Sequence, residues 1–158
     1  MPDTITPQQQ QSLRSWLKLL GGSNTIRKAL QSNLQAAHGV SLSRFDILAN
    51  LYRAPDAGIR MSHLSKQLMV SNGNVTQVMA PLIREGLVER TPCKNDARAA
   101  IAKLSDAGRQ FFEAMASDHA GWVDTLFAGL SPDDHKTLIR IMDKLRPDDP
   151  SDDFVGKP

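Results

Sequence analysis

The chain has 158 residues, 41% of them hydrophobic, and a formal net charge of +2. This apolar content is enough for a core, which excludes disorder of the whole chain, and the length fits one domain or one domain with an extension. The single cysteine excludes an intramolecular disulfide, and the lack of a signal sequence or of an apolar run near ~20 residues predicts a cytoplasmic protein with no membrane anchor.

The first predicted element follows a polar, glutamine-rich lead. Apolar residues recur at helical spacing over residues 13–20, Gly21-Gly22 interrupts them, and the pattern resumes over residues 26–37. Gly39 is a reasonable stop, because glycine readily adopts the left-handed conformation that ends many helices. The segment is predicted to be one long helix bent at the glycines, or two helices.

The next predicted helix begins near Ser43. Ser43 followed three residues later by Asp46 resembles a capping box. One face of the helix is apolar and should be buried; it carries Leu42, Phe45, Leu48, Ala49 and Tyr52. The turn formers of residues 55–58 should end it.

Residues 62–85 have the order of a helix-turn-helix. A short amphipathic segment over residues 62–68 precedes a second helical pattern, in which Val75, Met79 and Leu82 repeat on one buried face. Ser71 is the predicted N-cap, since its hydroxyl can accept from an orphan backbone N–H. The opposite face carries short polar side chains that could reach base edges or phosphates. With Ser62, the candidates are Ser71, Asn72, Asn74, Thr76 and Gln77.

Pro81 lies about ten residues into the second of these helices. It cannot donate the hydrogen bond that would run back to Gln77, and a proline inside a helix costs ~3 kcal/mol or kinks it. We therefore expect a bend after the polar first turns.

A hairpin is predicted next. Gly86 lets the chain leave the helix with positive φ, residues 87–91 alternate as a strand does, and residues 99–104 can form a return strand. Residues 92–97 between them carry turn formers. Lys94, Asn95 and Arg98 fall at or beside the tip, where a long cation could enter the minor groove of DNA.

The charges are unevenly placed. Residues 60–109 hold eight Lys/Arg and four Asp/Glu (8 − 4 = +4), whereas residues 147–158 hold four Asp and one Lys (1 − 4 = −3). A basic centre suits a partner that carries phosphates.

Two further helices are predicted after the hairpin. Ser105 can cap a long helix running to Gly129, and Ser131 is followed by Pro132 and two acidic residues, a favourable start for a last helix. Residues 147–158 are rich in Asp and Pro and are expected to be disordered.

Several motifs, in this order, resemble the MarR family of winged helix-turn-helix transcriptional regulators over residues 6–146. The ordered set is far more specific than a lone helix-turn-helix. It comprises Val70-Ser71 leading into Asn74-Val75-Thr76, then Gly86-Leu87-Val88-Glu89-Arg90, Asp96-Ala97-Arg98 and Leu104-Ser105-Asp106-Ala107-Gly108-Arg109.

The resemblance implies a mainly α fold with a small β-hairpin wing. The helix before the wing would read the major groove, while Arg98 would enter the minor groove with Asp96 orienting it. Ala99 stands where the family often has Arg, so one phosphate contact per wing would be absent. The implied organisation is an N-terminal dimerisation region (6–40), a winged helix-turn-helix domain (41–104), C-terminal linker and dimerisation helices (105–146) and an acidic tail (147–158).

The implied function is sequence-specific binding of a pseudo-palindromic operator in double-stranded DNA by a homodimer. The resemblance further implies a repressor released by a small aromatic or phenolic acid. Aromatic walls for such a ligand would come from Trp16, Phe45 and Trp122, although such residues more often fill a core or an interface. A polar or cationic partner for its carboxylate would come from His38, Arg44 or His119.

Other classes of function have weaker support. Cys93 beside Lys94 could sense oxidants, but an isolated cysteine is more often an inert small hydrophobe, and the redox-sensing family members have their cysteine near the start of the first helix.

A winged-helix protein–protein module is a further alternative. The sequence has no nucleophile elbow, phosphate-binding glycine loop or H-E-x-x-H, so we expect no enzyme. The four histidines are not grouped as metal ligands are, so no metal or other cofactor is expected.

Overall fold

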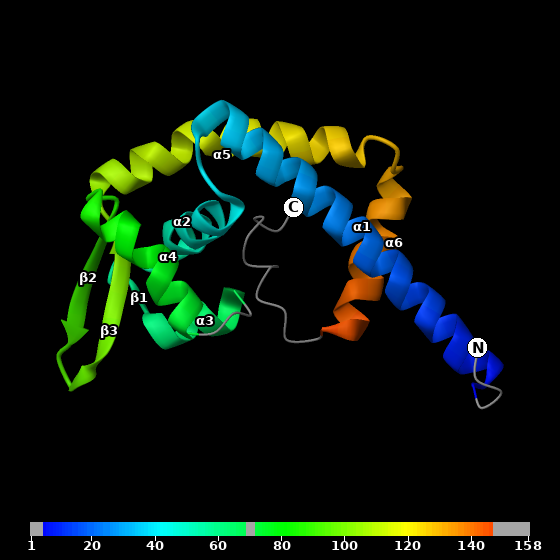
Figure 1. The fold of residues 1–158 in the computed structure, drawn as a ribbon, viewed down its shortest axis with the longest axis horizontal. Coiled ribbons are helices and arrows are strands. Elements are labelled where there is room, and N and C mark those ends of the chain that lie inside the picture. The colour runs from blue at the N-terminus through cyan, green and yellow to red at the C-terminus, as the bar shows by residue number, and fades with distance from the viewer. Residues whose placement is uncertain (1–4, 69–71, 147–158) are drawn as a thin grey trace. The chain divides into compact units, whose positions relative to one another are not determined.

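The computed structural model describes residues 5–68 and 72–146. Along the chain, the elements are α1 (Pro7–His38), α2 (Leu42–Arg53), β1 (Ile59–Arg60), α3 (Met61–Leu68), α4 (Asn72–Arg84), β2 (Val88–Cys93), β3 (Asp96–Leu104), α5 (Asp106–Phe127) and α6 (Pro132–Leu145) (Figure 1). The expected fold class, mainly α with a small β wing, is confirmed. The chain divides into two compact units, residues 1–42 and 43–158.

In the first unit, α1 is a single helix that runs through Gly21-Gly22, so one helix rather than two is confirmed, and the bend at the glycines stays a prediction. Thr6 caps it by accepting from the backbone N–H of Gln9, and Gly39 at φ 64° closes it as expected. Its burial is uneven: Leu30 and Leu34 are buried, whereas the N-terminal half exposes large apolar side chains.

The predicted capping box of α2 is wrong. The helix begins at Leu42, so Ser43 lies inside its first turn and cannot be the N-cap. The backbone N–H of Leu42 instead donates to the side-chain carbonyl oxygen of Gln31 at 2.8 Å. A side chain eleven residues upstream therefore satisfies one of the orphan backbone donors in the first turn of α2.

The second unit contains an antiparallel sheet in the order β1-β3-β2. Its hairpin β2–β3, here called the wing, was predicted, but its turn is shorter than the expected residues 92–97. Cys93 pairs with Asp96, which leaves only Lys94 and Asn95 in the turn. Pro92 lies within β2 and pairs with Ala100. A proline is tolerated there because β2 is an edge strand of the described sheet, where a ladder N–H is dispensable.

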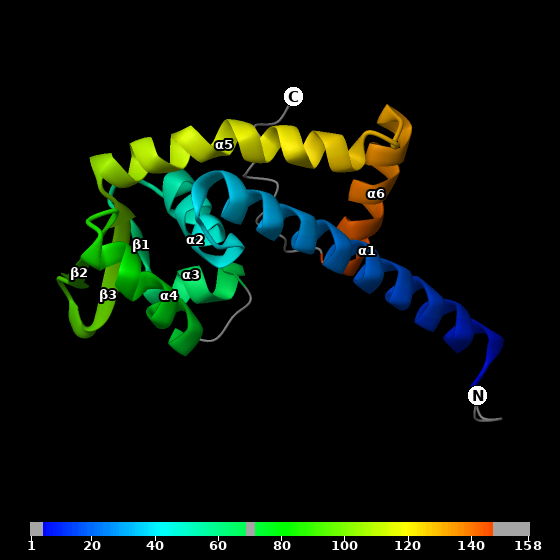
Figure 2. The same cartoon turned by 45° about the horizontal axis from the view of Figure 1, so that its top comes forward.

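Strand β1 was not predicted, because two residues are too short to show an alternating pattern. Ile59 pairs with Ala102 and Arg60 with Ile101, and α3 begins at the next residue. The strand therefore attaches the start of the helix-turn-helix to the base of the wing (Figure 2).

The core of the second unit lies between its helices and the sheet. Val75, Met79 and Leu82 of α4 are buried, as the helical spacing predicted. The aromatic ring of Phe112 in α5 lies 5.3 Å from that of Phe45 and 4.8 Å from that of Tyr52, both in α2. Burial of large side chains of this kind is the main favourable contribution to folding.

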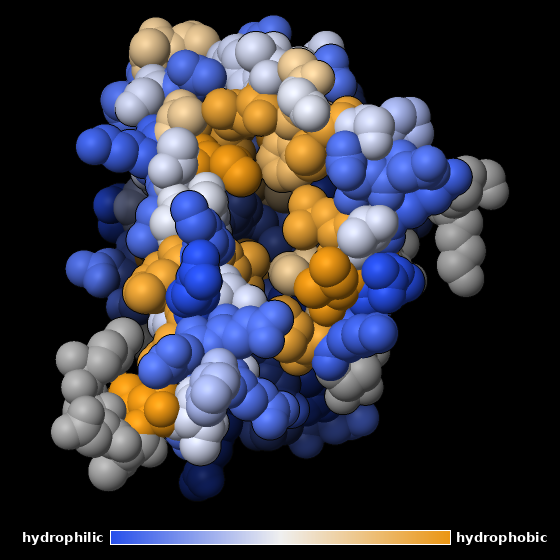
Figure 3. Space-filling model, turned by 90° about the vertical axis from the view of Figure 1, so that its right-hand side faces the viewer, coloured by the Kyte–Doolittle hydropathy of each residue, from blue (hydrophilic) through white to orange (hydrophobic). Residues whose placement is uncertain are grey.

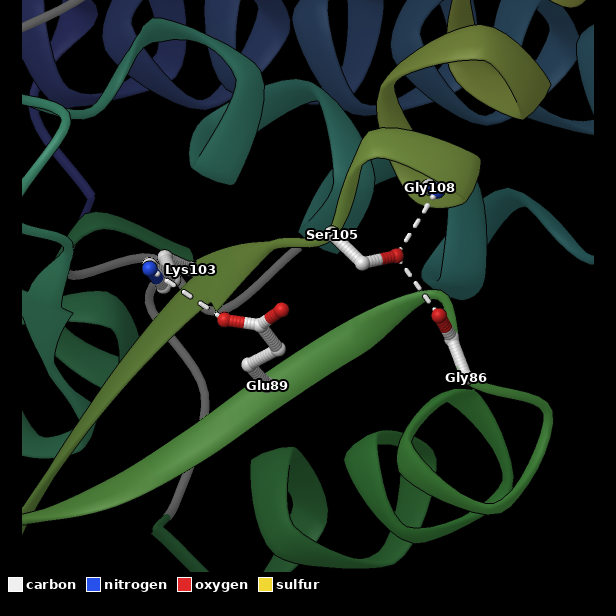
Figure 4. A network of polar contacts seen from close by, with 5 residues as sticks. All are labelled: Gly86, Glu89, Lys103, Ser105 and Gly108. Atoms are coloured by element: carbon white, nitrogen blue, oxygen red, sulfur yellow. Dashed lines mark hydrogen bonds and ion pairs between the residues drawn. The ribbon is translucent and has the colours of Figure 1, made fainter.

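A hydrogen-bonded joint connects the end of α4 to the start of α5 (Figure 4). The Ser105 hydroxyl accepts from the backbone N–H of Gly108 at 3.0 Å and donates to the carbonyl of Gly86 at 2.6 Å. This confirms the predicted cap, and Gly86 has the expected positive φ of 74°. A Cβ on Gly108 would lie 1.9 Å from the carbonyl oxygen of Leu87, so only glycine fits without movement.

The last helix, α6, starts as predicted: Ser131 and Asp134 form a capping box and Pro132 occupies the first turn. None of its described residues is buried. Its exposed large apolar side chains are Leu138, Ile139, Ile141 and Leu145. Figure 3 shows hydrophobic residues gathered at the surface on the side it views. No helix among the described residues is long and apolar enough to cross a membrane.

Candidate nucleic-acid interface

Helix α4 presents the polar face that the sequence predicted. Because Val75 and Met79 point into the core, the exposed side chains of Asn74, Thr76 and Gln77 lie on the other side of the first turns. Ser71 and the side chain of Asn72 lie outside the described residues. Pro81 is half-buried within a helix that continues to Arg84, and the expected bend remains a prediction.

The wing places its polar residues at and beside the turn. Lys94 and Asn95 form the turn and are exposed, and the side chain of Arg98 is exposed on β3. A carboxylate oxygen of Asp96 accepts from the backbone N–H of Arg98 at 3.0 Å. This hydrogen bond fixes the backbone from which the Arg98 side chain extends, because an Asp that bonds two residues onward closes a local turn.

A hollow of about 340 Å³ lies between the helix-turn-helix and the wing. It brings together four candidates from separate elements, namely Ser62 of α3, Thr76 of α4, and Asp96 and Arg98 of β3. Its other lining residues are Arg60, Met61, Ser65, Arg90, Ala99 and Ala100. Lys94 and Asn95 at the tip, and Asn74 and Gln77 on α4, are not among the lining residues.

Two lining cations, Arg60 and Arg90, were missed by the sequence interpretation. Arg60 belongs to the strand that the pattern was too short to show. Arg90 had no local signal and is placed by the pairing register: alternate residues of a strand share a face, and directly paired residues do so as well. The pairs Arg90 with Ala102 and Pro92 with Ala100 put Arg90 on the face of the wing that carries Ala100, another residue that lines the hollow.

Ion pairs support the elements of this interface. Arg44 of α2 pairs with Glu85 just after α4, and Lys103 of β3 pairs with Glu89 of β2 at 3.2 Å (Figure 4). Pairs this exposed contribute little to stability, at most ~1 kcal/mol each. They nevertheless link Glu85, the residue after α4, to α2, and the two strands of the wing to each other.

The candidate ligand residues are only partly brought together. Phe45, which is 5% exposed, stacks on His119 with ring centroids 4.2 Å apart. Burial lowers the pKa of His119 below its usual value, and the charge of Arg53 lowers it further. Arg44 engages Glu85, and Trp122 is half-buried. Trp16, which is 54% exposed, and His38 belong to the first unit.

A metal cluster and a reactive cysteine were the other kinds of site considered from the sequence. No group of three or more His, Cys, Asp or Glu that could hold a metal occurs in residues 5–68 and 72–146. Cys93 is a free thiol and only 7% exposed. Burial limits the access that an oxidant needs, which fits the inert interpretation of this cysteine.

Comparisons with known proteins agree with this geometry. The family model described as MarR family matches residues 38–99, a range that contains α3, α4 and β2. The helix-turn-helix-type transcriptional regulator YkoM of Bacillus subtilis (strain 168), itself uncharacterized, is 32% identical over 108 residues, covering 68% of this chain and 68% of that protein.

Two solved structures are similar over most of the chain. A MarR family transcriptional regulator from Silicibacter pomeroyi is 32% identical, with a TM-score of 0.74 over 89% of this chain and 97% of that one. Sco3205, a MarR family transcriptional regulator from Streptomyces coelicolor in complex with DNA, is 26% identical, with a TM-score of 0.78 over 94% of each chain.

Proposed function

The chain belongs to the MarR family of transcriptional regulators, and on that premise we propose that its winged helix reads a pseudo-palindromic operator in double-stranded DNA as part of a homodimer. The observation that carries the proposal is the hollow in which Thr76 of the recognition helix and Arg98 of the wing lie together. Helix and wing residues that converge on one side of a domain can contact adjacent grooves of the same duplex.

The proposed division of labour follows the exposure of the side chains. Asn74, Thr76 and Gln77 read base edges in the major groove, and Arg98 enters the minor groove from a backbone held by Asp96. Positioning contacts to phosphates complete the set; they come from Ser62, Ser71, Asn72, Lys94 and Asn95.

The proposed dimer uses helices of residues 6–40 and 105–146. Each region exposes large apolar side chains that a monomer would leave in water: Leu17 of α1 is 63% exposed and Leu145 of α6 is 67% exposed. Exposed apolar surface of this kind marks association sites. A two-fold dimer would place its half-site centres about one helical turn, ~10 base pairs, apart.

Selection of bound DNA from a random pool, followed by mobility shift with the selected duplex, tests the proposal most directly. The expected outcome is a two-fold related sequence bound more tightly than scrambled DNA by a factor of roughly 10³ or more at physiological salt. Equal affinity for selected and scrambled DNA would contradict the proposal, because it would show that the protein binds polyanions without sequence specificity.

We further propose that the protein is a repressor and that a small aromatic acid releases it from DNA. Support comes from the stacked pair Phe45 and His119 beside the charge of Arg53, which brings together the aromatic and cationic groups that an aromatic carboxylate needs. Such a ligand would shift DNA affinity 5- to 150-fold for a coupling of ~1–3 kcal/mol.

The test follows tryptophan fluorescence and operator binding together while benzoates, salicylates and hydroxycinnamates are titrated. The proposal requires that at least one compound changes both signals. If none does at millimolar concentration while oxidation of Cys93 or a chelator releases DNA, control is by redox chemistry or metal.

A further inference from the structure

The hollow beside the wing is lined by more cationic side chains than recognition of base edges requires. Arg60, Arg90 and Arg98 line it, and Asp96 is its lining carboxylate, so the formal charge of these groups is 3 − 1 = +2. Ser62, Ser65 and Thr76 add hydroxyl groups from α3 and α4. Guanidinium and hydroxyl donors around a hollow are the chemistry that recognises a phosphate.

The strand register and the lining of the hollow bring two of the arginines together. Arg90 lies opposite Ala102 and Pro92 lies opposite Ala100, so Arg90 and Ala100 share one face of the wing. The register then shifts before the pair of Cys93 and Asp96, and Arg98, between Asp96 and Ala100 on β3, lines the same hollow. Ala100 also lines the hollow and carries only a methyl group. Two long cationic side chains of the wing therefore line the hollow that Thr76 borders from the recognition helix.

The shape of DNA indicates what would occupy this position. The major and minor grooves are separated by a sugar–phosphate strand, and a protein that puts a helix in one groove and a wing in the next must let that strand pass between them. In this chain the space between α4 and the wing is the hollow, which is about 340 Å³ in volume.

Resting on the proposed function, we infer that this hollow is a phosphodiester site for the DNA strand between the two grooves. Arg90 is its positioning residue: it binds the backbone phosphate while Arg98 reaches beyond it into the minor groove. Such a contact carries no sequence information, but it fixes the register of the recognition helix on the duplex.

The first test measures salt dependence with Arg90→Gln. Removing one phosphate interaction from each half-site should reduce the slope of the log binding constant against the log salt concentration by about 1.8 in magnitude. Between about 50 and 200 mM salt, the wild type should therefore lose ~12-fold more affinity than the variant. Sequence preference should be unchanged. Lys103→Gln is the matched control, because it removes the same charge from the opposite face of the same sheet and should leave the slope as it is.

The second test changes the DNA and leaves the protein intact. Selected duplexes are made with one neutral methylphosphonate at each linkage in turn. Wild-type affinity should fall at the linkage between the bases read by α4 and the adjoining minor groove, and Arg90→Gln should show a smaller loss there. Arg90→Lys keeps the charge and should keep most of the slope.

The outcomes separate this inference from the proposed function. If Arg90→Gln keeps the wild-type slope and the same methylphosphonate profile while Arg98→Ala weakens binding, the phosphodiester site is wrong and the regulator stands. If the wild type prefers no DNA sequence, the proposed function itself is wrong.

Discussion

Arg98 and Gln77 project from different elements and should contribute different parts of DNA recognition. Arg98→Ala should weaken binding to most sequences. It should also reduce the slope of the log binding constant against the log salt concentration by roughly one for each half-site, because each half-site then has one protein cation fewer. Gln77→Ala should keep the slope but relax base preference, since one bidentate base contact contributes ~1–3 kcal/mol of discrimination. Mobility shifts with operator and scrambled DNA over a salt series measure both; an unchanged operator affinity and slope for Arg98→Ala would refute the wing assignment.

His119 makes a prediction about acid stability. Its folded-state pKa is lowered, mainly by burial, so folding favours the neutral imidazole. Its contribution to stability is therefore complete above the unfolded pKa of about 6.5 and is lost as pH falls through the folded pKa. Urea unfolding at several pH values should show wild-type stability decreasing below about pH 6.5, more steeply than in His119→Gln. His63→Gln, at an exposed histidine, should retain the wild-type pH profile.

At the scale of elements, the joint between α4 and α5 depends on a glycine. Gly108→Ala would place a Cβ 1.9 Å from a backbone oxygen, which must move. We expect a destabilisation of about 1–3 kcal/mol, as for other overpacked sites. Gly121→Ala is the control on the same helix, because nothing lies within 4 Å of its added Cβ. It should stabilise by about 0.5–1 kcal/mol through helix propensity. Equal effects of the two substitutions in denaturant unfolding would mean that α5 does not pack on Leu87 as described.

The elements that sequence predicted correctly are those whose determinants are local. Ser105 and Ser131 cap helices through bonds three residues away, and Val75 and Met79 show their burial by spacing alone. The start of α2 was missed because its N–H partner is the side chain of Gln31, which no local pattern indicates.

The candidate site divides in the same way. Thr76 and Arg98 could be identified from motifs, and the hollow contains both. Arg90 became recognisable only from the pairing register, and Arg60 only once β1 was known to border the base of the wing. Long-range pairing decides which side chains meet, and a single sequence does not display it.

At the scale of the whole molecule, the exposed apolar side chains predict self-association. Sedimentation at micromolar concentration should give a dimer. Leu17→Glu should shift it toward monomer, because a charge would be buried without a partner in the interface. Ser15→Glu adds the same charge two residues away, on nearly the opposite side of α1, and should remain dimeric. A wild-type monomer would contradict the proposed interface.

The exposed leucine and isoleucine side chains of α6 also affect the abundance of this protein in the cell. In the proposed dimer, folding and assembly are linked by mass action, so stability depends on protomer concentration. A newly made chain without a partner would expose the surface that chaperones and proteases recognise. At low protomer concentration the unpaired chains would be degraded, whereas at high concentration dimer formation would protect them. The amount of regulator available at the operator would then depend on protein turnover as well as on DNA affinity.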